Sequence, residues 1–165
     1  MKPQNNGSAR KRVVVTGMGA VAPNGIGIDA YAGALRDGTS GIAKITLFDA
    51  CGLDCQVAGE IKNFDADKFL HQQDARRVGR AVPLLLAAAG EALQRAGICS
   101  HSLTREEKQS WGVVIGSGGG AADFTEEQYR RYFSDQLRRV SAYNVSSSTP
   151  GGLSSVPLPQ ADKKL

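Results

Sequence analysis

The sequence contains 165 residues, 41% of them hydrophobic and 22% charged, which is ordinary for a soluble globular protein of one domain. Its net charge of +4 comes from a short amino-terminal stretch, so the composition does not indicate a nucleic-acid-binding protein. No apolar stretch approaches the roughly 20 residues of a membrane span, and three cysteines, an odd number, suit a reducing compartment better than a disulfide framework.

The first segment, residues 1–11, is a polar and basic head. Lys2, Arg10 and Lys11 lie in it and Arg12 follows, with no acidic residue among them. We expect this head to be disordered, because it has no apolar surface to bury. It also lacks the apolar run of a secretory signal, which together with the unpaired cysteines predicts a cytoplasmic location.

Residues 13–25 are the stretch around which the rest is organised. Three valines and Thr16 predict a short strand over residues 12–16 that is buried on both faces. Gly17 and Gly19 then allow a turn where a Cβ would clash. A Pro-Asn-Gly sequence at residues 23–25 lengthens the loop before any helix can start.

Gly17, Gly19 and Ala22 also satisfy the Gly-x-Gly-x-x-Ala fingerprint of dinucleotide-binding proteins. The context disfavours that interpretation, because a loop stands where the phosphate-binding helix should already run. Asp37, the acidic residue at the expected distance, lies in a helix stop rather than at the end of a second strand. A dinucleotide-binding domain is therefore the less favoured alternative.

The following segments alternate between helical and extended patterns. Residues 28–36 predict a helix with one apolar face and Gly38 as its C-cap. Residues 39–48 predict a connection, and the alternation over residues 56–61 predicts a strand. Residues 65–70 predict one or two helical turns.

The longest helical pattern covers residues 75–96, with Asp74 as N-cap and Gly97 as its stop. Pro83 interrupts this pattern, because within a helix it removes a hydrogen bond and clashes with the preceding turn. Either the helix kinks there or the true helix begins near Pro83. Small residues at 87–90 allow a second element to pack very close to this helix.

A second buried strand is predicted over residues 111–115, followed by the glycine run 116–120. The run lacks the lysine and hydroxyl of a phosphate loop, which favours a structural turn. Residues 125–140 predict a helix capped by Asp123 or Thr125.

One side of that predicted helix carries a group of four arginines: Arg130, Arg131, Arg138 and Arg139. The default interpretation is a solvated or partner-facing surface, and the functional alternative is a docking patch for an acidic carrier. Residues 146–152 then predict a loop, and residues 153–155 should open a helix. Pro157 and Pro159 forbid its continuation, so residues 156–165 are expected to lack stable secondary structure.

Short motifs from residue 12 to residue 155 together resemble β-ketoacyl-acyl-carrier-protein synthases, the thiolase-fold condensing enzymes. In chain order they are RVVVTGMG (12–19), NG (24–25), LRDGTSGI (35–42), FD (48–49), AG (58–59), DARRVGR (74–80), residues 87–97, GVVIGSGGG (112–120) and SSTP (147–150). Each motif is common alone, but their shared order is specific. The resemblance implies an α/β, thiolase-like fold, here an incomplete N-terminal half of layered α-β-α elements, over residues 12–155, with residues 156–165 as a tail outside the family pattern.

The resemblance also implies an activity and partners. Such enzymes perform decarboxylative Claisen condensation on carrier-bound thioesters in fatty acid or polyketide biosynthesis, bind acyl carrier protein and form homodimers. Neither a cofactor nor a metal is implied. The nucleophile of the family is a cysteine in a Thr-x-Cys-Ser/Thr-Ser context, which comes shortly after the point where this sequence departs from the pattern.

None of the three cysteines matches that context. Cys51 and Cys55 lie in a connecting segment, and Cys99 follows a helix stop. Cys51 and Cys55 could supply two metal ligands, but His71 and His101 are isolated in polar surroundings, so no metal site is expected. We assign no catalytic, cofactor-binding or metal-binding residue and expect no activated thiol.

The sequence thus predicts a chain that resembles 3-oxoacyl-[acyl-carrier-protein] synthase, is truncated before the nucleophile, and is inactive by itself. The alternative from another class is a non-catalytic binding or interaction module that keeps the same fold. In either case we expect an isolated chain of low stability. The strands predicted over residues 12–16 and 111–115 would lack partners and expose apolar faces.

Overall fold

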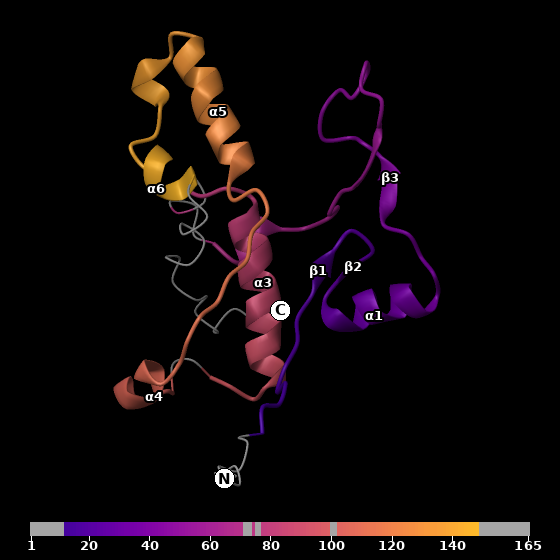
Figure 1. Cartoon of the computed structure of the whole chain (residues 1–165), viewed down its shortest axis with the longest axis vertical. Helices are drawn as coiled ribbons and strands as arrows, with labels where there is room; N and C mark the ends of the chain where they lie inside the picture. Colours follow the sequence, from indigo (N-terminus) through magenta and orange to yellow (C-terminus); the bar gives the residue numbers. More distant parts are fainter. Residues whose placement is uncertain (1–11, 71–73, 75–76, 100–101, 149–165) are drawn as a thin grey trace, which may run out of the picture.

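The structure is a computed structural model that describes residues 12–70, 74, 77–99 and 102–148. The predictions for residues 1–11, for His71 and His101 and for the tail 156–165 lie outside the described residues. Helix α3 (Ala81–Arg95) occupies the middle of the molecule. Two small hairpins and α1 lie on one side of it, and the pair α5 and α6 lies beyond one of its ends (Figure 1).

The first hairpin and the helix after it come directly from turn residues. Strand β1 (Val21–Ala22) pairs antiparallel with β2 (Gly25–Ile26). Gly27, with φ of 90°, then turns the chain into α1 (Ile28–Arg36). Gly38 follows the C-cap with φ of 66°, as a left-handed residue that ends a helix should. The helix predicted over residues 28–36 and its glycine stop are confirmed.

A second hairpin joins β3 (Ile42–Lys44) to β4 (Val57–Gly59). Strand β4 confirms the extended segment predicted over residues 56–61. The prediction that residues 39–48 form only a connection is wrong over β3. That strand is three exposed residues long, too short for an alternating pattern, and its pairing with β4 defines it.

Glu60 fixes the start of the loop that leaves β3. Its side chain accepts hydrogen bonds from the Thr46 amide (2.8 Å), the Thr46 hydroxyl (2.6 Å) and the Leu47 amide (2.9 Å). The residue is 9% exposed. Hydrogen bonding to the Thr46 side chain, and then to the two backbone amides, lowers the pKa of Glu60 below its ordinary value. The carboxylate form therefore stabilises this part of the fold.

We expect Glu60→Gln to destabilise the chain most above the ordinary pKa of a glutamate, 4.5. A depressed folded-state pKa adds stability that is present above that value and is lost as the pH falls through the folded pKa. Urea unfolding at pH 7 and at successively lower pH measures the difference between wild type and variant. Thr46→Val, which removes the hydroxyl donor, should raise the pKa of Glu60 in an NMR titration. A difference that does not change with pH would contradict the assignment.

Helix α3 begins close to its proline. Pro83 lies in the first turn, where the missing amide hydrogen would have no partner within the helix. Of the two alternatives predicted from the sequence, the late start is therefore confirmed. Gly97, with φ of 70°, follows the end of the helix as predicted. The buried core is centred on one face of α3 and comprises Leu70, Val82 and Leu86, with Phe69, Val78, Ala81, Leu85 and Ile115 packed against it.

The small residues of α3 allow a second segment to approach its backbone, as predicted. A Cβ on Gly17 would overlap the carbonyl oxygen of Ala92 and lie 2.8 Å from the amide nitrogen of Ala96. A Cβ on Gly19 would overlap the carbonyl oxygen of Ala88. The two glycines of the dinucleotide-like motif thus lie against a helix, and a hairpin follows them instead of a phosphate-binding helix.

The strands predicted over residues 12–16 and 111–115 are wrong. Neither segment has a hydrogen-bonded partner strand in the described part of the chain. Val13 is 93% exposed and Val114 is 99% exposed, whereas a buried strand would cover both. An apolar run becomes a strand only when another strand satisfies its amides and carbonyls, and none does so here.

The segment after residue 102 is largely helical. Its elements are α4 (Arg105–Gln109), α5 (Ala122–Phe133), the 3₁₀ turn η2 (Leu137–Arg139) and α6 (Asn144–Ser148). An earlier 3₁₀ turn, η1 (Ala66–Lys68), confirms the helical turn predicted over residues 65–70. No helix among the described residues is long and apolar enough to cross a membrane.

The single helix predicted over residues 125–140 is wrong at both ends. Helix α5 starts at Ala122 and stops at Phe133, because Asp135 adopts a left-handed φ of 56° before η2. Neither Asp123 nor Thr125 is its N-cap, which is Ala121. Residues 146–148, predicted as loop, belong to α6.

Candidate functional site

Helix α5 and the turn η2 present the four arginines that the sequence marks as a possible docking patch. We call Arg130, Arg131, Arg138 and Arg139 the arginine surface. The first two lie in the last turn of α5, and the other two lie in η2. The segments are joined because Arg131 donates a hydrogen bond to the carbonyl oxygen of Arg139 (3.0 Å). The structure thus brings together the four residues that the sequence suggested.

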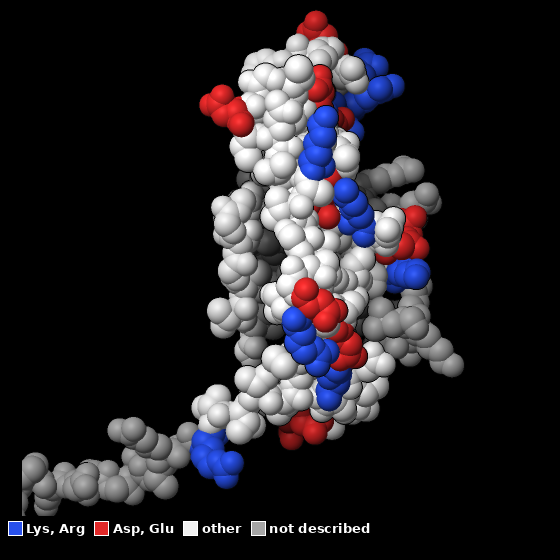
Figure 2. All heavy atoms as spheres, turned by 90° about the vertical axis from the view of Figure 1, so that its right-hand side faces the viewer, with Lys and Arg blue, Asp and Glu red and all other residues white. Residues whose placement is uncertain are grey.

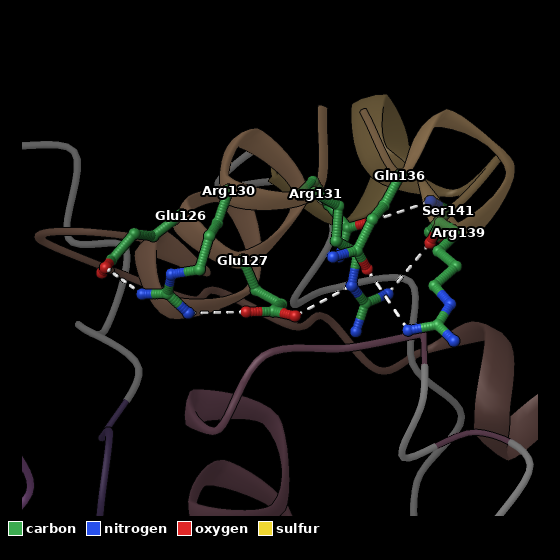
Figure 3. Close-up of polar contacts among 8 residues, drawn as sticks. Glu126, Glu127, Arg130, Arg131, Gln136, Arg139 and Ser141 are labelled. Atoms are coloured by element: carbon green, nitrogen blue, oxygen red, sulfur yellow. Dashed lines mark hydrogen bonds and ion pairs between the residues drawn. The ribbon is translucent and has the colours of Figure 1, made fainter. Parts of the chain in front are cut away.

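Two members of the arginine surface are ion-paired within α5. Arg130 contacts Glu126 and Glu127, each at 2.7 Å, and Arg131 contacts Glu127 at 2.8 Å (Figure 3). The hydrogen bond from Arg131 is the main cause that lowers the pKa of Glu127. All four side chains are at least one-third exposed, so these pairs contribute little stability. Their effect is to compensate the charges of Arg130 and Arg131.

The turn that carries the other two arginines is fixed against α5. Gln128, only 2% exposed, accepts a hydrogen bond from the Ser141 amide (2.8 Å). The side-chain oxygen of Gln136 accepts one from Arg139 (3.3 Å), as Figure 3 shows. A buried side-chain amide therefore holds the chain just beyond η2, and the backbone positions of Arg138 and Arg139 are set by the fold.

Arg138 and Arg139 are exposed and uncompensated. Among the described residues, no carboxylate lies within ion-pair distance of either side chain. The face shown in Figure 2 differs from this pair of arginines. Acidic and basic side chains are interspersed there along a strip between broad uncharged areas. Two consecutive arginines whose side chains have no paired carboxylate can instead bind carboxylates or phosphates of a partner.

Apolar side chains are exposed on the same helix. Tyr129, Tyr132 and Phe133 are 57%, 54% and 79% exposed. Their rings contact one another, with centroids 6.3 Å apart for Tyr129 and Phe133 and 5.2 Å for Tyr132 and Phe133. Aromatic groups next to arginine are typical of protein-binding surfaces, in which the rings supply contact area and the guanidinium groups supply orientation.

The predicted absence of a nucleophile stays a prediction, but the thiols can be located. Cys51 and Cys55 lie in the loop between β3 and β4, and Cys99 lies just beyond α3; all three residues are exposed. Within the described ranges no group of three or more His, Cys, Asp or Glu side chains could hold a metal ion. Cys99 thus lies in a different segment from the other two cysteines.

Sequence reasoning missed the carboxylates that organise the amino-terminal half. Glu91 of α3 accepts hydrogen bonds from the amides of Ala20 (3.1 Å) and Ile28 (2.8 Å). Asp123 accepts one from the amide of Arg80 (2.8 Å), at the start of α3. A signal existed for Glu91, because it is the only charged residue in α3 before Arg95. A charge within an apolar helix needs a partner.

Comparison with known proteins gives consistent results. The family model described as "Beta-ketoacyl synthase, N-terminal domain" matches residues 10–156. A Synechocystis protein named 3-oxoacyl-[acyl-carrier-protein] synthase 2 is 39% identical over 72% of this chain and 28% of its own length. The actinorhodin polyketide putative beta-ketoacyl synthase 2 of Streptomyces coelicolor is 35% identical over 79% of this chain and 31% of its own length.

A solved structure agrees with these matches. The ishigamide ketosynthase/chain length factor superposes with a TM-score of 0.69 at 27% sequence identity, covering 88% of this chain and 36% of that chain. The chain therefore spans about a third of the length of the relatives that it matches.

Proposed function

Since this chain belongs to the β-ketoacyl synthase family, whose N-terminal domain it matches over residues 10–156, we propose that it serves in decarboxylative Claisen condensation of carrier-bound thioesters. The relatives' names include both a 3-oxoacyl-[acyl-carrier-protein] synthase and an actinorhodin polyketide putative beta-ketoacyl synthase, so the pathway is fatty acid or polyketide biosynthesis. The proposed location is the cytoplasm. The fold is α/β and thiolase-like, as predicted from the sequence.

The condensation itself requires groups that we do not assign to this chain. An acyl chain must be held on a thiolate, and the enolate formed by decarboxylation must be stabilised by hydrogen-bond donors. Cys51, Cys55 and Cys99 are not preceded by a buried strand that leads to a nucleophile turn. We therefore propose that this chain alone does not catalyse the reaction and that it contributes scaffold and docking surface.

The docking surface is the arginine surface, and its ligand is the acidic acyl carrier protein. The proposal rests on the difference between the arginines that form ion pairs and those that do not. Arg130 and Arg131 are paired with glutamates, whereas Arg138 and Arg139 are exposed without a carboxylate in the described part of the chain. A positive site that is held by a structured turn attracts an acidic partner and orients it.

We expect the double variant Arg138→Glu/Arg139→Glu to bind acyl carrier protein at least about tenfold more weakly than wild type. Reversing two uncompensated charges replaces attraction by repulsion at the contact. Fluorescence anisotropy of labelled carrier protein at low and at physiological salt measures the effect. Affinity of the wild type should fall as salt rises, because ions screen exposed charges.

Arg36→Glu/Lys44→Glu is the matched control, because it changes the net charge by the same amount at two exposed residues of α1 and β3 that are not part of the arginine surface. Equal weakening by both variants would mean that net charge, and not this surface, governs binding. A condensation assay with malonyl-carrier substrate tests the other half of the proposal. Turnover by this chain alone would refute its assignment as scaffold, whereas carrier binding without turnover in any assembly would favour the interaction module.

Homodimerisation is proposed as well, because the fold leaves apolar segments open. Val14 and Val15 are 64% and 78% exposed, and Val113 is 70% exposed. Val13, Val14 and Val15 are consecutive and all exposed, and a contiguous apolar surface of this kind marks a protein–protein contact. A second synthase chain, or the remainder of a longer one, would cover them.

A further inference from the structure

The loop between β3 and β4 carries two of the three cysteines and has no part in the proposed carrier surface. Cys51 and Cys55 are both exposed in it. In Figure 1 this loop projects from the end of the hairpin, away from α3. Two thiols four residues apart in one exposed loop make a candidate redox site, provided that the chain between them is bent.

The chain does turn between the two cysteines. The Leu53 amide donates a hydrogen bond to the carbonyl oxygen of Ala50 (3.1 Å), and Gly52 adopts a φ of 90°. A positive φ at the third position of a hydrogen-bonded four-residue turn is typical of a type II turn, whose first and fourth Cα atoms lie within about 7 Å. The chain therefore turns directly after Cys51. The thiol of Cys55, which lies beyond the turn, donates a hydrogen bond to the carbonyl oxygen of Val57 (3.5 Å).

The base of the loop is closed as well. The Ile45 amide donates to the carbonyl oxygen of Gln56 (2.9 Å), and the Gln56 side chain donates to Leu53 (3.4 Å). Where the loop leaves β3, the Glu60 carboxylate accepts a hydrogen bond from the Leu47 amide (2.9 Å). Both ends of the loop are thus fixed by hydrogen bonds. This restricts the conformations of the loop and therefore limits the distance between the two thiols.

We propose that Cys51 and Cys55 form a dithiol site that closes reversibly to a disulfide in exchange with a low-molecular-weight disulfide such as oxidised glutathione. The thiolate of Cys51 attacks the glutathione disulfide and releases one glutathione thiolate. The thiolate of Cys55, its proton lost to solvent, then attacks the Cys51 sulfur and releases the second glutathione. Two protein thiols are oxidised, and one glutathione disulfide is reduced to two thiols. This exchange reaches its equilibrium with ordinary thiols and requires no activated one.

The test measures the effective concentration of the two thiols in glutathione buffers, using the full chain with Cys99→Ser to remove the third thiol. Mass spectrometry of alkylated samples gives the ratio of closed to open loop, in buffer and in concentrated urea. We expect the value in buffer to exceed the value in urea by at least about tenfold, because the turn and the closed base bring the thiols together in advance. Equal values, or a lower value in buffer, would overturn the proposal.

Two further variants separate the loop from general thiol reactivity. With Cys99 retained, Cys55→Ser should give only the mixed disulfide of Cys51 with glutathione, and a Cys51–Cys99 disulfide as abundant as the wild-type closed loop would contradict the pairing. Gly52→Ala strains the turn without touching other atoms, since no atom lies within 4 Å of the added Cβ. It should lower the effective concentration several-fold in buffer and leave the value in urea unchanged. An unchanged value in buffer would mean that the turn does not govern closure.

Discussion

Replacing Gly19 with valine should abolish the cooperative unfolding of the chain. The added Cβ would overlap the carbonyl oxygen of Ala88 and lie 2.9 Å from its carbonyl carbon. Neither group can rotate away, because both belong to the backbone of α3. Overpacking costs about 1–3 kcal/mol, and more where the backbone itself must move, which is a large part of the total stability of a small domain. Far-UV circular dichroism during urea unfolding, together with soluble yield, measures the loss.

Gly33→Ala is the matched control for this substitution. Gly33 lies within α1, and no atom lies within 4 Å of the Cβ that alanine would add. Alanine should stabilise the helix by about 0.5–1 kcal/mol, because glycine loses more conformational entropy on folding. If Gly19→Val unfolded like wild type, the close contact with α3 would be incorrect. The glycine motif at Gly17 and Gly19 would then need a different explanation, such as a ligand.

Glu91→Ala should lower the free energy of unfolding by about 2–3 kcal/mol. The Glu91 carboxylate accepts from the amides of Ala20 and Ile28 and contacts Arg95 at 3.2 Å, and its side chain is only 14% exposed. Alanine leaves two amides without an acceptor and removes the cap of α1, whose own N-cap residue is a glycine. Urea unfolding measures the change, and amide exchange at Ile28 should accelerate in the variant.

Asp29→Asn tests whether the ion pair or the capping hydrogen bonds carry this effect. Asp29 contacts Arg95 at 2.5 Å, but their side chains are 88% and 40% exposed. An exposed pair contributes little stability, so this variant should be nearly as stable as wild type. A larger loss for Asp29→Asn than for Glu91→Ala would show that the salt bridge, and not the cap, joins α1 to α3.

Helix limits were predictable where a local residue marks them. Gly38 and Gly97 mark the ends of α1 and α3, and Pro83 restricts the start of α3, since each acts through its own backbone geometry. The order of the short motifs was sufficient to predict the family and its fold. These predictions needed no knowledge of distant contacts.

The strand predictions failed because a strand is defined by two segments. Residues 13–15 have the valines that a buried strand requires, yet nothing in the described chain pairs with them. Strand β3 was missed for the opposite reason, since Ile42 is exposed and its pairing with Gly59 alone defines it. The apolar pattern of a sequence indicates which side chains can be buried. It does not indicate which other segment offers its backbone amides and carbonyls for strand pairing.

The arginine surface was predictable in its composition and only partly in its electrostatics. Glu126 and Glu127 stand three or four residues before their arginines, a spacing that predicts ion pairs on a helix. The break at Asp135 was not predictable from the apolar pattern, which continues past it. That break moves Arg138 and Arg139 off the helix and away from those glutamates.

The carboxylate contacts have a consequence for the order in which the chain folds during its synthesis. Helix α1 has nine residues, too few to be stable alone, and the carboxylate that caps it lies 63 residues farther along the chain. The amide of Arg80, at the start of α3, in turn donates a hydrogen bond to the carboxylate of Asp123, which lies 43 residues farther on. Helix α1 is thus synthesised before the residues that stabilise it, and among the described elements consolidation proceeds from the later segments back toward α1.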